Sequence, residues 1–181
     1  MIVRSAKAAD ATAVAAIYGH HVLHGLGTFE ETPPDVKDIA GRIAAVTALG
    51  LPYLVAEEGK GLIGFAYAAP FRPRVAYRYT AEDSVYVAPS AAGRGVGKAL
   101  LGAVIAACEE MGLRQVMAVI GDSANADSIG LHRALGFTPS GVCRSVGFKH
   151  GRWVDTVWMQ RALNVGGGAP PTGPGLNLAG G

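Results

Sequence analysis

The sequence predicts a mixed α/β fold, with a central sheet of about seven strands flanked by about four helices. Three observations predict it. Seven short segments have the alternating or continuous apolar character of strands, and four longer segments repeat apolar residues at helical spacing. Along the chain they occur as strand, helix pair, strands, helix, strand, helix, strands. This order indicates a mixed sheet with one or two parallel pairs.

The strand segments are short and bounded by turn residues. Residues 84–87 alternate, are rich in β-branched and aromatic side chains, and are stopped by Pro89. Residues 115–120 form a nearly continuous apolar run, which is typical of a strand covered on both faces. The turns EGKG and KHGR each join two segments into a hairpin. The seven predicted strands are residues 2–4, 53–57, 62–68, 82–87, 115–120, 142–148 and 153–160.

Capping residues and glycines mark the helices. Asp10 can cap the first helix, and Thr32 followed by Pro33 can begin the second by their N-cap and N1 preferences. Glycine follows each of the last three helices, as expected at a helix C-terminus. The four predicted helices are residues 10–24, 32–49, 96–111 and 122–135.

Composition places residues 1–163 in one domain with an adequate core, since 50% of the 181 residues are hydrophobic. The net charge of +2, without a Lys/Arg run, indicates no nucleic-acid partner. Cys108 and Cys143 are expected to be free buried thiols in a reducing compartment. No long apolar run or signal peptide is present, so a cytoplasmic protein with no membrane partner is expected.

From residue 164 the chain is dominated by glycine and proline without a repeat. Such a segment buries too little apolar surface to offset its ordering entropy. Residues 164–181 are therefore predicted to be a disordered tail, in which Leu176 and Leu178 are too few to indicate a docking motif.

A glycine-rich turn opens the third helix. The first turn of a helix has unpaired N–H groups and a partial positive charge, so a pyrophosphate can bind there, with Arg94 and Lys98 as cationic donors. A Walker A loop would require Gly in place of Ala92 and Ser or Thr in place of Ala99. A dinucleotide-binding fingerprint would require Gly in place of Lys98, so neither pattern is present. A glycine-rich turn without a ligand is the alternative. The residues assigned to the anion are Gly93, Arg94, Gly95, Val96, Gly97 and Lys98.

The turn AGRGVG, residues 92–97, resembles motif A of the GNAT N-acetyltransferase superfamily, in which Gln or Arg, two residues, Gly, one residue, and Gly or Ala bind acetyl-CoA. Ala92 departs from the usual Gln or Arg. The resemblance covers residues 1–163 and implies a GNAT fold with a sheet splayed at its middle. It also implies acetyl-CoA as the acetyl donor, and no metal.

The segment TAEDSVYV resembles the phosphinothricin and methionine sulfoximine (or sulfone) acetyltransferase branch of this superfamily. The resemblance implies Glu82 as the general base, and a raised pKa would suit a carboxylate to that role. Asp83 is the competing carboxylate, and both can instead be polar residues at a strand end. The segment that follows, Val85, Tyr86 and Val87, would contact the pantetheine arm through its main chain while its side chains belong to the core.

Asn125, Ser128 and His132 follow one another at spacings of three and four and therefore share a helical face. Propensity alone favours a helix cap for Asn125 and a satisfied core residue for His132. The superfamily pattern N-x-x-(A/S)-x-x-x-Y-x-x-x-G-F implies instead that Asn125 and Ser128 face the pantetheine. His132 occupies the Tyr position and is the candidate acid for the leaving thiolate, although this step can proceed without an enzyme acid.

The candidate substrate-binding residues are inferred mainly from the resemblance to the same branch. Arg72 and Arg74 suit a substrate carboxylate because a guanidinium binds that group with two donors, although they can also be ordinary surface residues. TFEE, an aromatic residue at position 79 and GFKHGRW-D recur in the branch. The resemblance implies a pocket for a small amino acid, a homodimer, and a hairpin that reaches the neighbouring subunit. The pocket residues implied are Phe29, Glu30, Tyr79 and Lys149.

His20, His21 and His24 are interpreted as structural, because no Cys, Asp or Glu completes a metal site in that helix. The expected function is acetyl transfer to the α-amine of a small amino acid, without a covalent acetyl-enzyme. The alternative enzymatic function is acetylation of a protein N-terminus or a polyamine. The alternative non-enzymatic function is that of an acyl-CoA-binding sensor.

Overall fold

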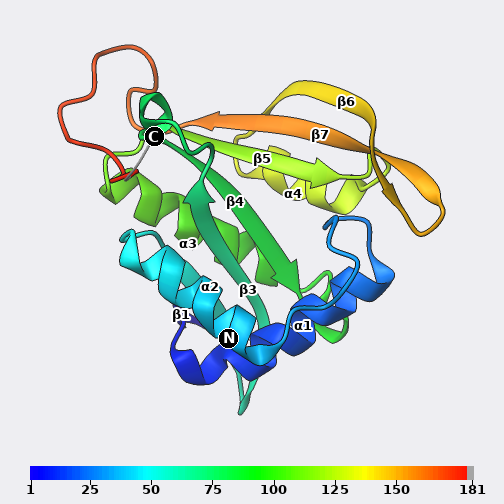
Figure 1. Ribbon diagram of the computed structural model, residues 1–181. Helices are drawn as coiled ribbons and strands as arrows, with labels where there is room; N and C mark the ends of the chain where they lie inside the picture. Colours follow the sequence, from blue (N-terminus) through cyan, green and yellow to red (C-terminus); the bar gives the residue numbers. More distant parts are fainter. Residues whose placement is uncertain (179–181) are drawn as a thin grey trace.

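The computed structural model describes residues 1–178 and contains one seven-stranded sheet, in the order β1-β2-β3-β4-β5-β7-β6 (Figure 1). This confirms the predicted α/β class and sheet. The strands are β1 (Ile2–Ser5), β2 (Tyr53–Glu58), β3 (Gly61–Pro70), β4 (Thr80–Val87), β5 (Gln115–Gly121), β6 (Thr138–Lys149) and β7 (Arg152–Ala162).

The sheet is open at its centre, between β4 and β5. These two strands form the parallel pair of the sheet, and the other neighbouring pairs are antiparallel. Pairing of β4 with β5 ends at Glu82↔Met117, although β4 continues to Val87 and β5 to Gly121. The two strands therefore diverge over their C-terminal halves, as the predicted splayed sheet requires.

Helices cover both faces of the sheet (Figure 1). Tyr18 packs against the rings of Phe65 and Tyr86 on one face. On the other face, the first turn of a helix lies against the side chains of Val85 and Val87. Alternate residues of β4 thus point to opposite faces. The helices are α1 (Ala11–His24), α2 (Val36–Ala48), α3 (Val96–Glu110) and α4 (Ala126–Ala134), with 3-10 helices η1 (Ala8–Asp10), η2 (Val75–Tyr77) and η3 (Pro89–Ala91). Among residues 1–178, no helix has the length and apolar character that crossing a membrane requires.

The second helix begins later than predicted. Thr32 and Pro33 precede α2, whose N-cap is Asp35. The carboxylate of Asp35 accepts a hydrogen bond from the amide of Asp38 at 2.8 Å, and the Asp38 carboxylate accepts one from the Asp35 amide at 3.4 Å. This reciprocal pair satisfies amides that would otherwise be unpaired at the helix start, so Asp35 determines where the helix begins.

Two smaller predictions are wrong. Asp10 precedes α1, but its carboxylate accepts hydrogen bonds from Arg4 and from the amide of Lys7 instead of capping that helix. Cys108 is buried as expected, and burial raises the pKa of its thiol to about 12. Cys143 is exposed, because it lies on the edge strand β6.

The C-terminal segment follows a defined path as far as residue 178, although its composition predicts disorder. Leu176 is 5% exposed and lies in the hydrophobic core, against which Leu178 also packs. The amide of Leu176 donates to the carbonyl of Arg78 at 2.7 Å. Two leucines thus anchor the segment because the folded domain offers them an apolar surface. Residues 179–181, to which the same prediction applies, lie outside the described residues.

Candidate functional site

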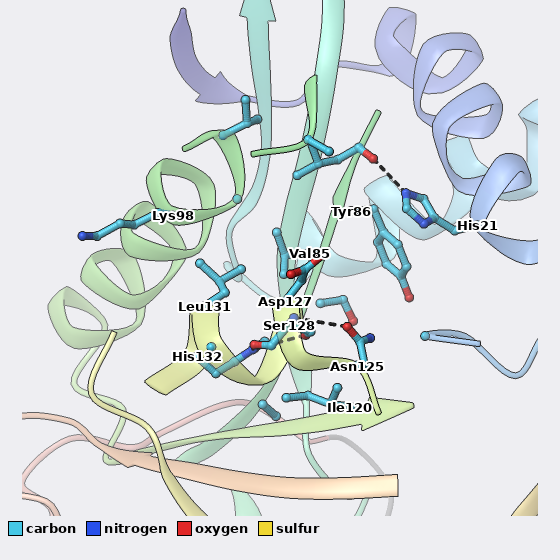
Figure 2. A pocket seen from close by; sticks show the side chains of 18 of the residues that line it. His21, Val85, Tyr86, Lys98, Ile120, Asn125, Asp127, Ser128, Leu131 and His132 are labelled. Carbon is cyan, nitrogen blue, oxygen red and sulfur yellow. Dashed lines mark hydrogen bonds between the residues drawn. The ribbon is translucent and has the colours of Figure 1, made fainter. Parts of the chain in front are cut away.

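A cavity of about 740 Å³ lies in the opening between β4 and β5 (Figure 2). Residues 83–87 of β4 and 118–121 of β5 form two of its walls. The turn before α3, the exposed side of α4 and the loop after α1 complete it. The cavity therefore occupies the place where the sheet splays, and its volume is typical of a site for a cofactor-sized ligand.

The turn before α3 is shaped to bind an anion. Gly93 and Gly95 have positive φ angles of 72° and 79°, and a Cβ atom on either would meet no heavy atom within 4 Å. The first hydrogen bond of α3 runs from Ala99 to the carbonyl of Gly95, so the amides of residues 96–98 have no acceptor within the helix. These amides and the partial positive charge of the helix N-terminus together favour a phosphate group.

The side chains around this turn do not all face the cavity. Lys98 lines it, whereas Arg94 forms an ion pair with Glu58 at 2.6 Å. Gly97 allows α3 and α4 to approach closely, because a Cβ atom there would lie 3.2 Å from Cδ2 of Leu131. The structure therefore places Lys98 at the predicted anion site and directs Arg94 to a different partner.

The edge of β4 that faces the opening carries free backbone groups. The amide of Ala88 donates to Ile63 on β3, and antiparallel pairing alternates along a strand, so the amides of Val85 and Val87 point away from β3. The carbonyl of Val87 accepts a 2.8 Å hydrogen bond from Nε2 of His21. The remaining groups of this edge can bind an extended ligand as an additional strand would bind.

His21 is a cavity residue, although its place in the sequence predicts only a structural role. It lines the cavity, and burial lowers the pKa of its imidazole, so a neutral ring donates from Nε2 to Val87. The rings of His20 and His24 lie 4.8 Å apart on the same helix. Among residues 1–178, no three His, Cys, Asp or Glu side chains are grouped to hold a metal. No local pattern marks His21, because its partner lies 66 residues away.

Glu82 lies where the opening closes. It is the last residue of β4 paired with β5, and by alternation its side chain points to the face that carries Tyr86, away from that of Asp83. It does not line the cavity itself but lies at its closed end. Burial raises the pKa of Glu82, the charge of Asp83 raises it further, and Arg72 opposes both. A half-buried carboxylate of this kind can accept a proton near neutral pH.

Asp83 forms a buried pair with His132. Its Oδ2 lies 3.0 Å from Nε2 of His132, and both side chains are almost wholly buried. Burial raises the pKa of Asp83 more than the hydrogen bond from His132 lowers it. For His132, burial opposes the charged ring, but the hydrogen bond and charge of Asp83 outweigh it and raise the pKa. Asp83 Oδ1 is buried without a hydrogen-bond partner among residues 1–178.

Asn125, Ser128 and His132 line the cavity from one face of α4, as predicted from their spacing (Figure 2). The side-chain oxygen of Asn125 accepts from the amide of Ser128 at 3.2 Å, and its nitrogen donates to the carbonyl of Gly121 at 3.3 Å. Asn125 is therefore the helix cap as well as part of the cavity wall. Both nitrogens of His132 have partners, since Nδ1 also lies 2.7 Å from the Ser128 carbonyl.

Residues 21–137 match the family described as Acetyltransferase (GNAT) family. The chain belongs to the GNAT acetyltransferase family. A phosphinothricin N-acetyltransferase from Alcaligenes faecalis is 56% identical to it over 164 residues, which cover 91% of this chain and 83% of that protein. An L-methionine sulfoximine/L-methionine sulfone acetyltransferase from Salmonella typhimurium is 38% identical over 164 residues, covering 91% of this chain and 95% of that protein.

A solved structure shows the same GNAT fold with the acetyl donor bound. The crystal structure of a GNAT superfamily phosphinothricin acetyltransferase from Sinorhizobium meliloti in complex with AcCoA has a TM-score of 0.93 and 46% sequence identity, covering 98% of this chain and 96% of that chain. This GNAT protein is therefore an N-acetyltransferase of the predicted branch. The free amides of residues 96–98 and the open edge of β4 fit acetyl-CoA as its acetyl donor.

Arg72 and Arg74, which the sequence assigns to the substrate, lie exposed on the loop between β3 and β4. The guanidinium of Arg72 lies over the rings of Phe71 and Trp158, at 5.1 and 5.7 Å from their centroids. Its charge also lowers the pKa of Glu82 against the effect of burial. The structure thus brings Arg72 and the predicted base to one region.

The two tyrosines of this loop have different environments. Tyr79 donates its hydroxyl to the carbonyl of Gly173 at 2.6 Å, so this predicted substrate residue is bonded to the C-terminal segment. Tyr77, which no motif in the sequence marks, is 42% exposed and packs edge-on against Phe71. Aromatic residues two positions apart could not be told apart from their sequence context.

The loop that follows α1 carries two predicted substrate residues. Phe29 packs on β6, where a Cβ atom at Gly147 would overlap its ring. Glu30 accepts two hydrogen bonds from Arg42, at 2.7 and 3.1 Å, and these lower the pKa of its carboxyl. Tyr18 donates a third hydrogen bond to it. The charge of Glu30 is therefore neutralised within the protein.

Lys149, the predicted substrate residue on β6, is buried. Its ammonium donates to the carbonyl of Thr28 at 2.8 Å, and burial lowers its pKa. This contact connects the end of β6 to the loop after α1. Lys149 and the packing of Phe29 on Gly147 thus fix the loop against the sheet.

Proposed function

We propose that this GNAT enzyme transfers the acetyl group of acetyl-CoA to the α-amine of a small amino acid of the methionine sulfoximine, methionine sulfone or phosphinothricin type. The observation that carries this proposal is the position of Glu82, which lies at the closed end of the splayed strands beside a cationic loop. The substrates named for the relatives at 38% and 56% identity support the choice of acceptor.

Acetyl-CoA supplies an activated acyl group as a thioester. The amides at the start of α3 and Lys98 would bind its pyrophosphate, and the edge of β4 would bind its pantetheine arm. Glu82 would take a proton from the acceptor ammonium directly or through a water. A free amide of β4, on Val85 or Val87, is positioned to stabilise charge on the acyl oxygen.

The attack is direct, within a ternary complex. Neither Cys108 nor Cys143 lines the cavity, so no thiol is available there for a covalent acetyl-enzyme. His132 lines the cavity, but both its ring nitrogens are engaged. Proton donation from Nε2 to a leaving thiolate would first break the bond to Asp83, so we assign His132 a positioning role in the cavity wall.

The charges around the loop favour an acceptor with a carboxylate. Arg72 and Arg74 are exposed, and a guanidinium binds a carboxylate with two donors. A polyamine would require free acidic groups, whereas Glu30 is already paired with Arg42. Acetylation of a protein N-terminus and non-catalytic binding of acyl-CoA are the alternatives that an activity assay separates.

The deciding experiment measures thiol release from acetyl-CoA with methionine sulfone, methionine sulfoximine, phosphinothricin, the ordinary amino acids, spermidine and a short peptide. We expect turnover with the tetrahedral amino acids and little with spermidine or the peptide. Preferred turnover of the peptide would move the assignment to protein N-termini. Binding of acetyl-CoA by calorimetry without turnover of any amine would identify a sensor.

We also propose that the enzyme is a homodimer that associates through β6 and β7. Val142, Val146, Phe148 and Trp153 are 45–65% exposed on this hairpin, which forms the edge of the sheet. Exposed apolar patches of this kind are typical of protein interfaces. Sedimentation should show a dimer for the unaltered chain and a monomer for Phe148→Glu with Trp153→Glu. A monomeric unaltered chain at micromolar concentration would overturn the proposal.

A further inference from the structure

We propose that the C-terminal segment, residues 164–178, acts through its residues 173–176 as a positioning segment for the acceptor loop, which we define as residues 71–79. This inference rests on the proposed function, because it concerns the loop that carries Arg72 and Arg74. The C-terminal segment leaves the end of β7, loops outwards and returns towards the start of β4 (Figure 1).

The first part of the segment is fixed to the domain by Arg114. This guanidinium donates to the carbonyls of Gly166, Ala169 and Pro170, at 3.2, 3.0 and 3.1 Å. Asn164 adds hydrogen bonds from its side chain to the carbonyls of Glu109 and Leu113. The path of the segment is therefore set before it reaches the acceptor loop.

The second part of the segment binds the last two residues of the acceptor loop. Tyr79 donates its hydroxyl to the carbonyl of Gly173 at 2.6 Å, and the amide of Leu176 donates to the carbonyl of Arg78 at 2.7 Å. Leu176 is 5% exposed in the hydrophobic core, so the bonded backbone is anchored by an apolar side chain. These two hydrogen bonds and the buried leucine hold this end of the loop, together with the amides of Arg114 and Gln115, which donate to the carbonyl of Tyr79 at 2.9 and 3.2 Å.

Between its ends the loop is held mainly at Phe71, whose ring packs edge-on against Tyr77 and Trp158. The amide of Phe71 donates to the carbonyl of Thr80 at 3.3 Å, and η2 forms a single turn within the loop. Arg72 and Arg74 are exposed between these points. The guanidinium of Arg72 also packs on Phe71 and Trp158, so it is the direction of Arg74 that depends most on where the C-terminal segment holds Arg78.

Gly175 allows the segment to approach this closely. Its φ angle is +72°, and a Cβ atom there would lie 2.7 Å from the carbonyl oxygen of Arg78 and 2.9 Å from Cε1 of Tyr79. Gly173 offers a matched control in the same segment, because a Cβ atom there meets nothing within 4 Å and its φ angle is not positive. Gly175→Ala should displace the acceptor loop, whereas Gly173→Ala should not.

Acetyl-CoA binding should be unaffected by the displacement. The anion-binding turn follows the far end of β4, and the eight residues of that strand separate it from Arg78 by about 25 Å. Gly175→Ala should therefore raise the KM for the amino acid by about tenfold, equivalent to 1.4 kcal/mol. The Kd for coenzyme A should change less than twofold.

The experiment applies two readouts to three forms of the 181-residue chain. These are the unaltered protein, the Gly175→Ala variant and the Gly173→Ala variant. Hydrogen–deuterium exchange of amides 74–79 reports the anchoring of the loop without any substrate. Steady-state kinetics report the KM for the amino acid and for acetyl-CoA separately. Leu176→Ala, which removes only the apolar anchor, replaces Gly175→Ala if that variant fails to fold.

Faster exchange in the loop together with a higher amino-acid KM, in Gly175→Ala alone, supports the proposal. Equal exchange in the two glycine variants overturns it, and this comparison holds even if the unaltered chain acetylates no amino acid. Faster exchange with an unchanged amino-acid KM also overturns it, because the loop would then be anchored without being positioned. Absence of turnover by the unaltered chain counts against the proposed function instead.

Discussion

Nε2 of His132 lies 3.0 Å from Oδ2 of Asp83, and this buried pair joins α4 to β4 across one wall of the cavity. Nδ1 of His132 must carry a hydrogen, because its partner is the carbonyl of Ser128, which can only accept. One further proton is then shared between Nε2 and Asp83. The pair is either an imidazolium with a carboxylate or a neutral ring with a carboxylic acid, and each form satisfies the contact.

The first prediction concerns the stability of this pair. Asp83→Ala should lower the free energy of unfolding by about 3–5 kcal/mol, because it leaves a buried ring nitrogen without a partner. Asp83→Asn should lower it much less, since the amide can donate to Nε2 of a neutral ring. Urea unfolding of both variants measures the difference. Equal losses would show that the hydrogen bond does not stabilise the fold.

The second prediction is the pH dependence of stability. The pKa values of Asp83 and His132 are both raised in the folded protein, so the folded pair keeps its one shared proton at a pH where the unfolded histidine has lost its own. The contribution of the pair therefore falls as pH rises above about 6.5. The stability difference between the unaltered protein and Asp83→Asn should shrink from pH 5 to pH 9. Growth of that difference would contradict the raised pKa values.

Features set by local chemistry could be predicted from the sequence. Spacings of four residues or fewer and turn chemistry predict the helix after the glycine turn and the shared face of Asn125, Ser128 and His132. They also predict the order of helices and strands along the chain. The same reasoning places Glu82 near the turn, because it lies on the strand that leads into it.

Features set by distant partners could not be predicted. Arg94 pairs with Glu58, 36 residues away, and Tyr79 bonds Gly173, 94 residues away. Arg94 and Tyr79 both have side chains that suit the roles predicted for them. The direction in which each side chain points depends on the partner that the fold brings near, and residue spacing in the sequence does not identify that partner. The path of the C-terminal segment depends on distant contacts in the same way.

The third prediction tests the base. Glu82→Gln should lower kcat by about 10²–10⁴-fold, the range for loss of a general base, with little change in acetyl-CoA binding. Because burial raises the pKa of Glu82, the activity of the unaltered enzyme should fall as pH decreases through a value above 4.5. This limb of the pH profile should be absent in Glu82→Gln. Full activity of the variant at neutral pH would assign the base elsewhere.

The fourth prediction separates the two loop arginines. Arg72→Ala and Arg74→Ala should each raise the KM for an amino acid with a carboxylate. Arg72 also lowers the pKa of Glu82, so only Arg72→Ala should move the acid limb of the kcat/KM profile to higher pH. Rate profiles of both variants between pH 5 and 9 measure this. A shift of equal size in Arg74→Ala would show that Glu82 does not sense Arg72 specifically.

The fifth prediction concerns the approach of α3 to α4. A Cβ atom on Gly97 would lie 3.2 Å from Leu131, so Gly97→Ala should shift the first turn of α3, whose amides we propose as the pyrophosphate site. Calorimetry should show coenzyme A binding weakened by about three- to tenfold, equivalent to about 0.7–1.4 kcal/mol.

Gly102→Ala on the same helix is the control, because a Cβ atom there meets only Leu135, at 4.0 Å. Alanine in a helix interior is favoured over glycine by about 0.5–1 kcal/mol, so both variants gain helix stability and only Gly97→Ala should lose affinity. Equal affinities would place the pyrophosphate away from this turn.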